Sequence, residues 1–354
     1  MNFRLRILLP FLLPLPLLAQ HLSPIPPAPP TVQLDVTVNG HSGKPVPGLA
    51  QSNFTVTDNG TPQQILSFHA VEAPSSDPPV QVIVLIDTVN TTFLKVTYER
   101  DQIRQFLRKS GPTLPYPLSF VFFANTYTQM QRVPSRDTAA LLAEFDKQVT
   151  GLRTIGRSAG FEGASERLQL SLKVLSQVAA LEQGVPGRKL LIWISPGWPY
   201  LSGPQIRLSE GNRRGIFSSV VDLSTMLQNA RITLYSVDPV GVASTGLSFS
   251  HYYESFLDNV TSLKEIQSGN LALQVLSLHS GGKVLNAGSD IGKEIAACID
   301  DASAFYVLTV PRLQADSPDT FHAIQVKLPD TSFKARTING YYAQPLSPSP
   351  GGPH

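Results

Sequence analysis

A near-continuous run of aliphatic and β-branched residues from Val80 to Ile86 constrains the fold of this chain more than any other segment. A strand with one face in water alternates apolar and polar residues. This run lacks that alternation, which indicates a strand covered on both faces. Such strands lie in mainly parallel sheets, so the run predicts an α/β fold with helices on both sides of a sheet.

The segments that follow alternate between strand and helix patterns. Further apolar runs predict strands at Leu118–Phe123, Leu190–Ile194 and Ile232–Val237, with a short strand at Lys283–Leu285. Apolar residues at helical spacing predict helices at Thr92–Lys109, Thr138–Val149, Leu168–Leu181, Val220–Ala230, Leu271–His279 and Asp290–Ile299. We therefore expect residues 80–301 to form a doubly wound, mainly parallel α/β domain of Rossmann-like type, with the four main strands in one sheet.

Strand patterns stand on both sides of this region. Residues 31–72 contain alternating apolar positions and turn signals, and residues 303–343 contain strand-like runs at Phe305–Val310, Phe321–Leu328 and Phe333–Ile338. Each flanking segment is too short to build a good core alone. We predict that the two segments pair into one small β module that packs against the α/β domain.

The N-terminal residues predict export. Arg4 and Arg6 precede an apolar stretch from Ile7 to Leu18, and Ala19 offers a small residue at a cleavage point, so residues 1–19 have the pattern of a signal peptide. A membrane anchor is the alternative, but the stretch is shorter than the ~20 residues of a spanning helix and is broken by prolines. Residues 20–30 are expected to be a proline-rich linker and residues 344–354 a disordered tail, with the mature protein in the periplasm or outside the cell.

The composition narrows the function further. The formal net charge is +2 without a basic block, which argues against nucleic acid and anionic membranes as partners. No segment after the N-terminal one is apolar and long enough to cross a bilayer. Cys298 is the only cysteine, so an intrachain disulfide and a thiolate metal cluster are excluded, and the seven histidines show no metal-ligand spacing.

Four stretches together resemble one family. V-I-V-L-I-D-T-V-N-T at 82–91 resembles the first strand and loop of von Willebrand factor A (VWFA) domains. The strand pair at 53–68, the segment G-R-K-L-L-I-W-I-S-P-G-W-P at 187–199 and the ending I-N-G-Y-Y-A at 338–343 are similar to exported bacterial VWFA-related proteins of the acidobacterial type. The resemblance implies a VWA-like domain that mediates protein–protein interaction or adhesion in the cell envelope.

The resemblance also implies a metal-ion-dependent adhesion site, because VWFA domains hold a divalent cation with an Asp-x-Ser-x-Ser motif and later residues. Asp87 matches the aspartate, Thr91 replaces the second serine, and Ser165 is a weak match for the middle-loop threonine. Val89 and Pro196 stand at ligand positions and cannot ligate. We expect a degenerate site that binds magnesium or calcium weakly or not at all, no other cofactor, and an Asp87 that ties its loop through hydrogen bonds.

Polar residues after the predicted strands share one edge, because the carboxyl ends of parallel strands meet where such sheets bind ligands. We predict a rim there that binds a protein partner. Its predicted members are Asp87, Asn90, Thr91, Asn125, Ser195, Trp198 and Asp238. The aromatic run at Trp198 favours recognition, since aromatic residues are enriched at interface hot spots. The alternative is that Trp198 packs under a loop from Gln205 to Gly215.

A hydrolase and a purely structural envelope domain are the other functions to consider. Gly156–Gly160 matches the string G-x-S-x-G, but no buried strand precedes it, and Ser195 has no histidine nearby in the sequence. The glycine patterns of dinucleotide and phosphate loops do not follow Ile86. We expect a binding protein rather than an enzyme.

Overall fold

The computed structural model describes residues 30–73, 79–148, 160–201, 206–239, 251–286 and 288–345. The predicted signal peptide, almost all of the predicted linker and tail, and most of the string from Gly156 to Gly160 lie outside the described residues. Among the described helices, none combines the length and the apolar character needed to span a bilayer.

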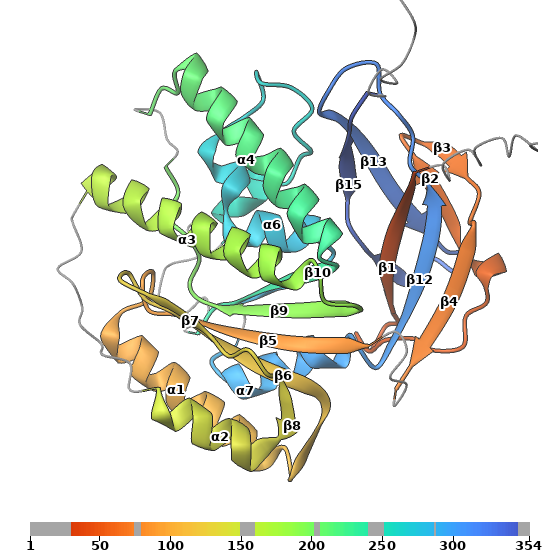
Figure 1. The fold of residues 1–354 in the computed structure, drawn as a ribbon. Coiled ribbons are helices and arrows are strands. Elements are labelled where there is room, and N and C mark those ends of the chain that lie inside the picture. Colours follow the sequence, from red (N-terminus) through yellow and green to blue (C-terminus); the bar gives the residue numbers. More distant parts are fainter. Residues whose placement is uncertain are drawn as a thin grey trace, which may run out of the picture.

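A mainly parallel sheet runs through the α/β part of the chain, in the order β11-β10-β9-β5-β6-β7 (Figure 1). Its parallel strands are β5 (Val80–Asp87), β6 (Thr113–Phe123), β9 (Arg188–Ile194), β10 (Ile232–Val237) and β11 (Val284–Leu285). β7 (Thr128–Met130) and β8 (Ser135–Asp137), which the sequence did not predict, pair with β6 in the antiparallel sense. The prediction that the four main strands share one sheet is confirmed.

Helices cover both faces of this sheet (Figure 1). One face carries α1 (Phe93–Lys109), α2 (Thr138–Lys147) and α7 (Ile291–Asp300), and the other carries α3 (Gly160–Glu182), α4 (Glu210–Asn229) and α6 (Leu273–His279). Val82 and Val84 pack into the core on the face covered by α1, α2 and α7, whereas Ile83 and Leu85 pack into the core on the opposite face. Burial on both sides is the reason why the run in β5 shows no alternation.

Two helices begin earlier than predicted. α3 begins at Gly160 rather than Leu168, and α4 begins at Glu210 rather than Val220. The prediction of a loop from Gln205 to Gly215 is therefore wrong from Glu210 onward, where α4 has already begun. Ser209 caps α4 because its hydroxyl accepts a hydrogen bond from the Asn212 backbone N–H at 3.1 Å. The first turn of α4 is polar, and Phe161 is the only apolar side chain in the first turn of α3, so apolar periodicity does not reveal these helix starts.

The flanking segments form two four-stranded antiparallel sheets. One has the order β14-β1-β12-β4 and the other the order β15-β13-β2-β3. The strands are β1 (Thr31–Asn39), β2 (Thr55–Asp58), β3 (Thr61–Gln63), β4 (Ser67–Glu72), β12 (Ala304–Pro311), β13 (Thr320–Lys327), β14 (Lys334–Arg336) and β15 (Gly340–Ala343). Short 3₁₀ helices lie at Gln51–Asn53, Tyr252–Phe256 and Ser268–Leu271.

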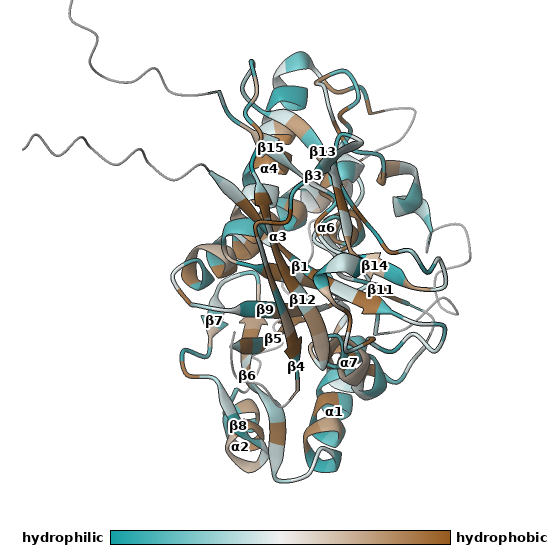
Figure 2. Cartoon of the chain, turned by 90° about the vertical axis from the view of Figure 1, so that its right-hand side faces the viewer, coloured by the Kyte–Doolittle hydropathy of each residue, from teal (hydrophilic) through white to brown (hydrophobic). Residues whose placement is uncertain are grey.

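Strands from the two ends of the chain alternate in the sheet β14-β1-β12-β4 and meet at the pair of β13 and β2 in the other sheet. β1 pairs with β12 and β14, and β2 pairs with β13, as the predicted pairing of the segments requires. The two sheets share one hydrophobic core, to which Leu34, Val56 and Leu308 contribute. The apolar residues of β1 and β12 lie side by side in the middle of the module (Figure 2).

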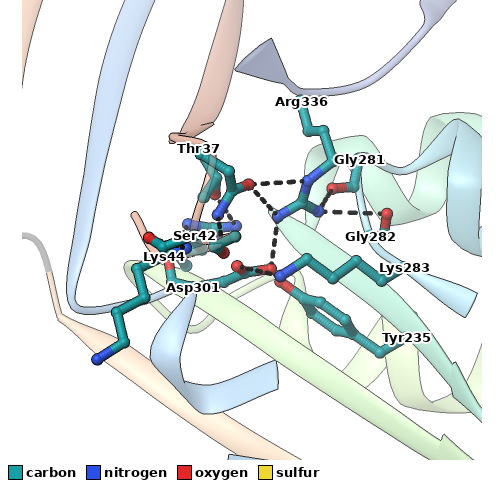
Figure 3. A network of polar contacts seen from close by, with 12 residues as sticks. Thr37, Ser42, Lys44, Tyr235, Gly281, Gly282, Lys283, Asp301 and Arg336 are labelled. Atoms are coloured by element: carbon teal, nitrogen blue, oxygen red, sulfur yellow. Dashed lines mark hydrogen bonds and ion pairs between the residues drawn. The ribbon is translucent and has the colours of Figure 1, made fainter. Parts of the chain in front are cut away.

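A buried polar network joins the β module to the α/β part (Figure 3). Asp301 is fully buried; its Oδ1 accepts from Lys283 Nζ at 2.7 Å, and its Oδ2 accepts from Arg336 Nη2 at 2.7 Å and from the Tyr235 hydroxyl at 2.9 Å. Burial alone would raise the pKa of Asp301, but the Arg336 and Lys283 cations outweigh it and hold that pKa below its ordinary value. Arg336 also donates to the side-chain oxygen of Asn39 in β1 at 3.1 Å, so one carboxylate links three parts of the chain.

Candidate functional site

The carboxyl ends of the parallel strands lie at the end of the sheet away from the β module (Figure 1). The module sits at the amino ends, where Arg188, the first residue of β9, donates to the Thr37 hydroxyl of β1 at 3.0 Å. The chain leaves β5 for β6 on one side and returns to β9 on the other. β5 and β9 therefore flank a topological switch point, the place where open α/β sheets bind ligands.

Asp87, the last residue of β5, has a carboxylate that four protein donors surround. Its Oδ1 accepts from the backbone N–H groups of Val89 and Asn90, each at 2.9 Å. Its Oδ2 accepts from Asn90 Nδ2 at 2.8 Å and from Trp193 Nε1 at 3.0 Å. Burial raises the pKa of Asp87, and the hydrogen bonds from Asn90, Trp193 and Val89 oppose that rise. The hydrogen bonds from Val89 and Asn90 tie the Asp87 carboxylate to the loop that follows β5, as the sequence predicted.

The α3 hydroxyl linked to this loop is Ser171, not Ser165. Asn90 Nδ2 also donates to Ser171 Oγ at 2.9 Å. Ser165 lies six positions earlier on α3, about 9 Å along the helix axis at 1.5 Å per residue.

The expected metal ligands therefore do not fit a magnesium or calcium ion. A hard cation needs several free oxygen ligands. Here the Asp87 oxygens face N–H donors, and Val89 places a buried aliphatic side chain where the motif has a hydroxyl.

The loop after β9 is held by packing and by α6. Gly197 has φ +108°, and a Cβ there would lie 2.4 Å from Gln274 Nε2, so the position requires glycine. Gln274 Nε2 donates to the carbonyl of Pro196 at 3.2 Å, and the Tyr200 hydroxyl donates to Gln274 Oε1 at 3.2 Å. These contacts fix the loop in one conformation.

Trp198 is buried in this loop, with 2% of its surface exposed. Its ring packs edge-on against Trp193, with centroids 5.0 Å apart and planes at 72°. The packing alternative is therefore correct for Trp198, and its placement on a contact surface is wrong. Trp198 belongs to the hydrophobic core to which residues of α3 and α4 also contribute.

The other predicted rim residues differ in exposure. Thr91 and Ser195 are buried, and Ser195 Oγ accepts from the Gly197 backbone N–H at 3.2 Å. Asn90 and Asp238 are half-buried, and Asn125 is exposed in the turn between β6 and β7. The residues do follow the carboxyl ends of their strands, but only Asn90, Asn125 and Asp238 have side chains that a partner could reach.

Two acidic residues near this edge escaped the sequence reasoning. Glu99 of α1 is fully buried, and neither carboxylate oxygen has a hydrogen-bond partner among the described residues. Burial, then the charges of Asp87 and Asp238, raise the pKa of Glu99 well above its ordinary value. In α7, burial first and then Asp238 and Asp290 raise the pKa of Glu294 to about 7. An acidic position within an amphipathic helix gives no sequence signal of burial. Within the described ranges, no cluster of histidine, cysteine, aspartate or glutamate residues could hold a metal ion.

A groove of about 440 Å³ opens between the N-terminal turns of α3 and α4. We call it the rim groove. α3 runs back from the carboxyl edge toward β9, and α4 starts just after β9 ends, so both helix starts lie at that edge. The groove is lined mainly by apolar side chains, including Phe161, Leu168, Leu201, Ile206, Leu208 and Ile216. Phe161 is 57% exposed, and Ser165 lies in the same lining.

Comparison with known proteins gives distant structural matches only. No family model matches the chain, and no curated protein matches it. A proximal thread matrix protein from the mussel byssus is 12% identical with a TM-score of 0.34, covering 63% of this chain and 48% of its own. The manganese-loaded TRAP protein of Plasmodium vivax is 12% identical with a TM-score of 0.35, covering 79% of this chain and 98% of its own.

A third match is the three N-terminal domains of the pilus tip protein Mfa5 from Porphyromonas gingivalis, 11% identical with a TM-score of 0.36, covering 89% of this chain and 67% of its own. The chain spans about half the length of the mussel protein. Because these TM-scores are low, we base the function on this chain's own residues.

Proposed function

We propose that this chain is an exported, VWA-like protein that binds another polypeptide at the rim groove, and that it is not an enzyme. The single observation that carries the proposal is an exposed apolar groove at the carboxyl edge of a doubly wound sheet. Soluble proteins rarely leave contiguous apolar surface open to water unless it meets a partner. Phe161, more than half exposed on the first turn of α3, is an aromatic anchor of the kind found at interface centres.

The side chains near this edge support binding rather than catalysis. A nucleophilic serine needs an exposed hydroxyl and a histidine within hydrogen-bond reach. Ser195 is buried, and its hydroxyl is bonded to the backbone of Gly197. The pairing of His322 with Asp58, at 2.8 Å, lies inside the β module, where Tyr341 also donates to Asp58 at 2.6 Å. That cluster is buried and ties β2 to β13 and β15.

The exposed residues of the groove also favour recognition over a purely structural role. A structural domain would cover its apolar side chains within the fold. Here Phe161 is exposed, and the nearby Trp198 is enclosed. Since Asp87 is occupied by four protein donors, we propose that partner binding does not require a bound cation.

The test is quantitative crosslinking of the mature chain in native cell-envelope extract. Phe161→Ser should reduce the crosslinked partner by about tenfold, the ratio that loss of roughly 1.4 kcal/mol gives. Leu94→Ser is the matched control, because Leu94 is 79% exposed on α1, across the sheet from the groove. Equal yields from the wild type and Phe161→Ser would contradict the proposal, and so would equal losses in both variants.

A further inference from the structure

Three acidic side chains from separate elements interact on the face of the sheet that α1 and α7 cover. Glu99 belongs to α1, Glu294 belongs to α7, and Asp238 follows the last residue of β10. The charge of Asp238 raises the pKa of both Glu99 and Glu294. α7 packs beside α1 and against β9 and β10, so these elements enclose the three side chains (Figure 1). We call them the acid cluster.

The protein supplies few donors to the acid cluster. Glu294 is 8% exposed and Glu99 is fully buried. Among the described residues, Glu294 Oε2 and both carboxyl oxygens of Glu99 have no hydrogen-bond partner. Lys95 of α1 lowers the pKa of Glu99, but burial and the charges of Asp87 and Asp238 have larger, opposite effects. An ionised carboxyl is costly in such surroundings, so the cluster favours the protonated form of its buried members.

Glu294 is the member that titrates near neutral pH. Burial raises its pKa to about 7, with smaller contributions from the charges of Asp238 and Asp290, and a hydrogen bond from the Gly288 backbone N–H opposes the rise. Cys298, which Glu294 also affects, is fully buried with a pKa well above its ordinary value and stays neutral. If α7 opened to water at Glu294, the carboxyl would return toward its ordinary pKa of 4.5. The closed form therefore binds the proton more tightly than the open form does.

The two ends of α7 are held differently. Around its first turn, the Tyr98 hydroxyl donates to the Ser289 carbonyl at 2.7 Å and Asp290 Oδ1 accepts from the Lys293 backbone N–H at 2.9 Å; both contacts are exposed. The last turn runs directly into Asp301, whose fully buried carboxylate is fixed by the network that joins the β module. The first turn can thus open while the last turn stays in place.

We infer that the first turn of α7 is a proton-dependent switch: it is closed while Glu294 carries a proton and opens, together with the segment from Gly288, when that proton is released. Opening uncovers Ile291 and Ile295, which are fully buried in the core that α1 shares. The switch lies across the sheet from the rim groove, so it does not depend on the proposed partner.

The test is amide hydrogen exchange of the mature chain, followed by mass spectrometry from roughly pH 5 to pH 8. After correction for the intrinsic exchange rate, the opening equilibrium of residues 291–295 should rise about tenfold per pH unit and level off above about pH 7. Residues 298–301 should show no such rise, because the Asp301 network holds them.

Three variants separate the acid cluster from general effects of pH. Glu294→Gln keeps an acceptor for Gly288 and removes the titration, so its opening equilibrium should not change with pH. Asp238→Asn removes a like charge, so the rise should level off at a lower pH. Glu162→Gln, an exposed position on the first turn of α3, is the matched control and should keep the wild-type profile.

A measurement on the wild type covers the case in which a variant fails to fold. In carbon-13 NMR of labelled glutamate carboxyl groups, the Glu294 signal should titrate with a midpoint near 7. A midpoint near the ordinary value of 4.5 overturns the inference. It is equally overturned by a pH-independent opening of residues 291–295 in the wild type, by a rise that persists in Glu294→Gln, or by an unchanged profile in Asp238→Asn.

Discussion

Replacing Asp301 with asparagine removes a fully buried carboxylate that joins the β module to the α/β part, and leaves the less buried ion pair between Asp35 of β1 and Arg231 in place. Asparagine keeps the size of the side chain but leaves the Lys283 and Arg336 cations, 26% and 22% exposed, without their counter-ion. Breaking a buried ion pair by removing one partner costs about 3–5 kcal/mol. Arg336 retains the carbonyl of Gly281 at 2.8 Å, so we expect a loss near the lower end, about 3 kcal/mol.

The assay is urea unfolding followed by two signals. Trp193 and Trp198 are both buried in the α/β part, so tryptophan fluorescence reports that part, and far-ultraviolet circular dichroism reports the whole chain. The two transitions should coincide in the wild type and separate in Asp301→Asn, because the module then unfolds on its own. Asp300→Asn, the exposed neighbour, is the control and should change stability by less than about 0.5 kcal/mol.

The same residue sets a pH dependence. The pKa of Asp301 is lower in the folded chain than its ordinary value of 3.8. The contribution of the Asp301 carboxylate to the free energy of unfolding is therefore fully present above pH 3.8 and is lost as the pH falls through the folded pKa. The difference in stability between the wild type and Asp301→Asn should therefore shrink only below about pH 4. An Asp301→Asn midpoint equal to that of Asp300→Asn, with coincident transitions, would refute the reasoning.

Three further outcomes are expected, each measured by urea unfolding. Gly197→Ala should lose at least about 1 kcal/mol, because φ is positive and the added Cβ meets Gln274, whereas Gly184→Ala, with open space around it, should not. Trp198→Ala should lose about 3–5 kcal/mol as a core residue, and a loss below about 1 kcal/mol would show that the ring is not packed as described. Glu99→Met should raise the free energy of unfolding by about 1–3 kcal/mol near neutral pH. Because the pKa of Glu99 is raised in the folded chain, the variant should also lose the decrease in stability that the wild type shows with rising pH. An unchanged pH profile would contradict the burial of Glu99 as an unpartnered acid.

The sheet was predictable because its strands are buried on both faces, and a run such as Val80–Ile86 has few other stable positions in a fold. The pairing of the terminal segments followed from their size, since neither could build a core alone. The starts of α3 and α4 could not be predicted from the spacing of apolar residues along the sequence. Their first turns face solvent or the rim groove, where Glu210 and Gly211 have no core to match.

The candidate site was predictable in position but not in exposure. Asp87 and Ser195 follow buried strands, which places them at the carboxyl edge whatever the loops do. The inward position of Trp198 could not be predicted, because its packing against Trp193 and the contact of Gln274 with the neighbouring Pro196 appear only in three dimensions. Glu99 and Glu294 carry no sequence signal for the same reason: burial of a helical acid depends on what packs over it.

The most direct test of the account is one paired measurement of partner capture. Mature wild-type chain is crosslinked in native envelope extract, once with magnesium and calcium and once with a chelator in excess. The account predicts the same yield of crosslinked partner in both samples, because the Asp87 carboxylate is engaged by Val89, Asn90 and Trp193 rather than by a cation. A partner lost on chelation and restored by magnesium would contradict it, as would the absence of any crosslinked partner in both samples.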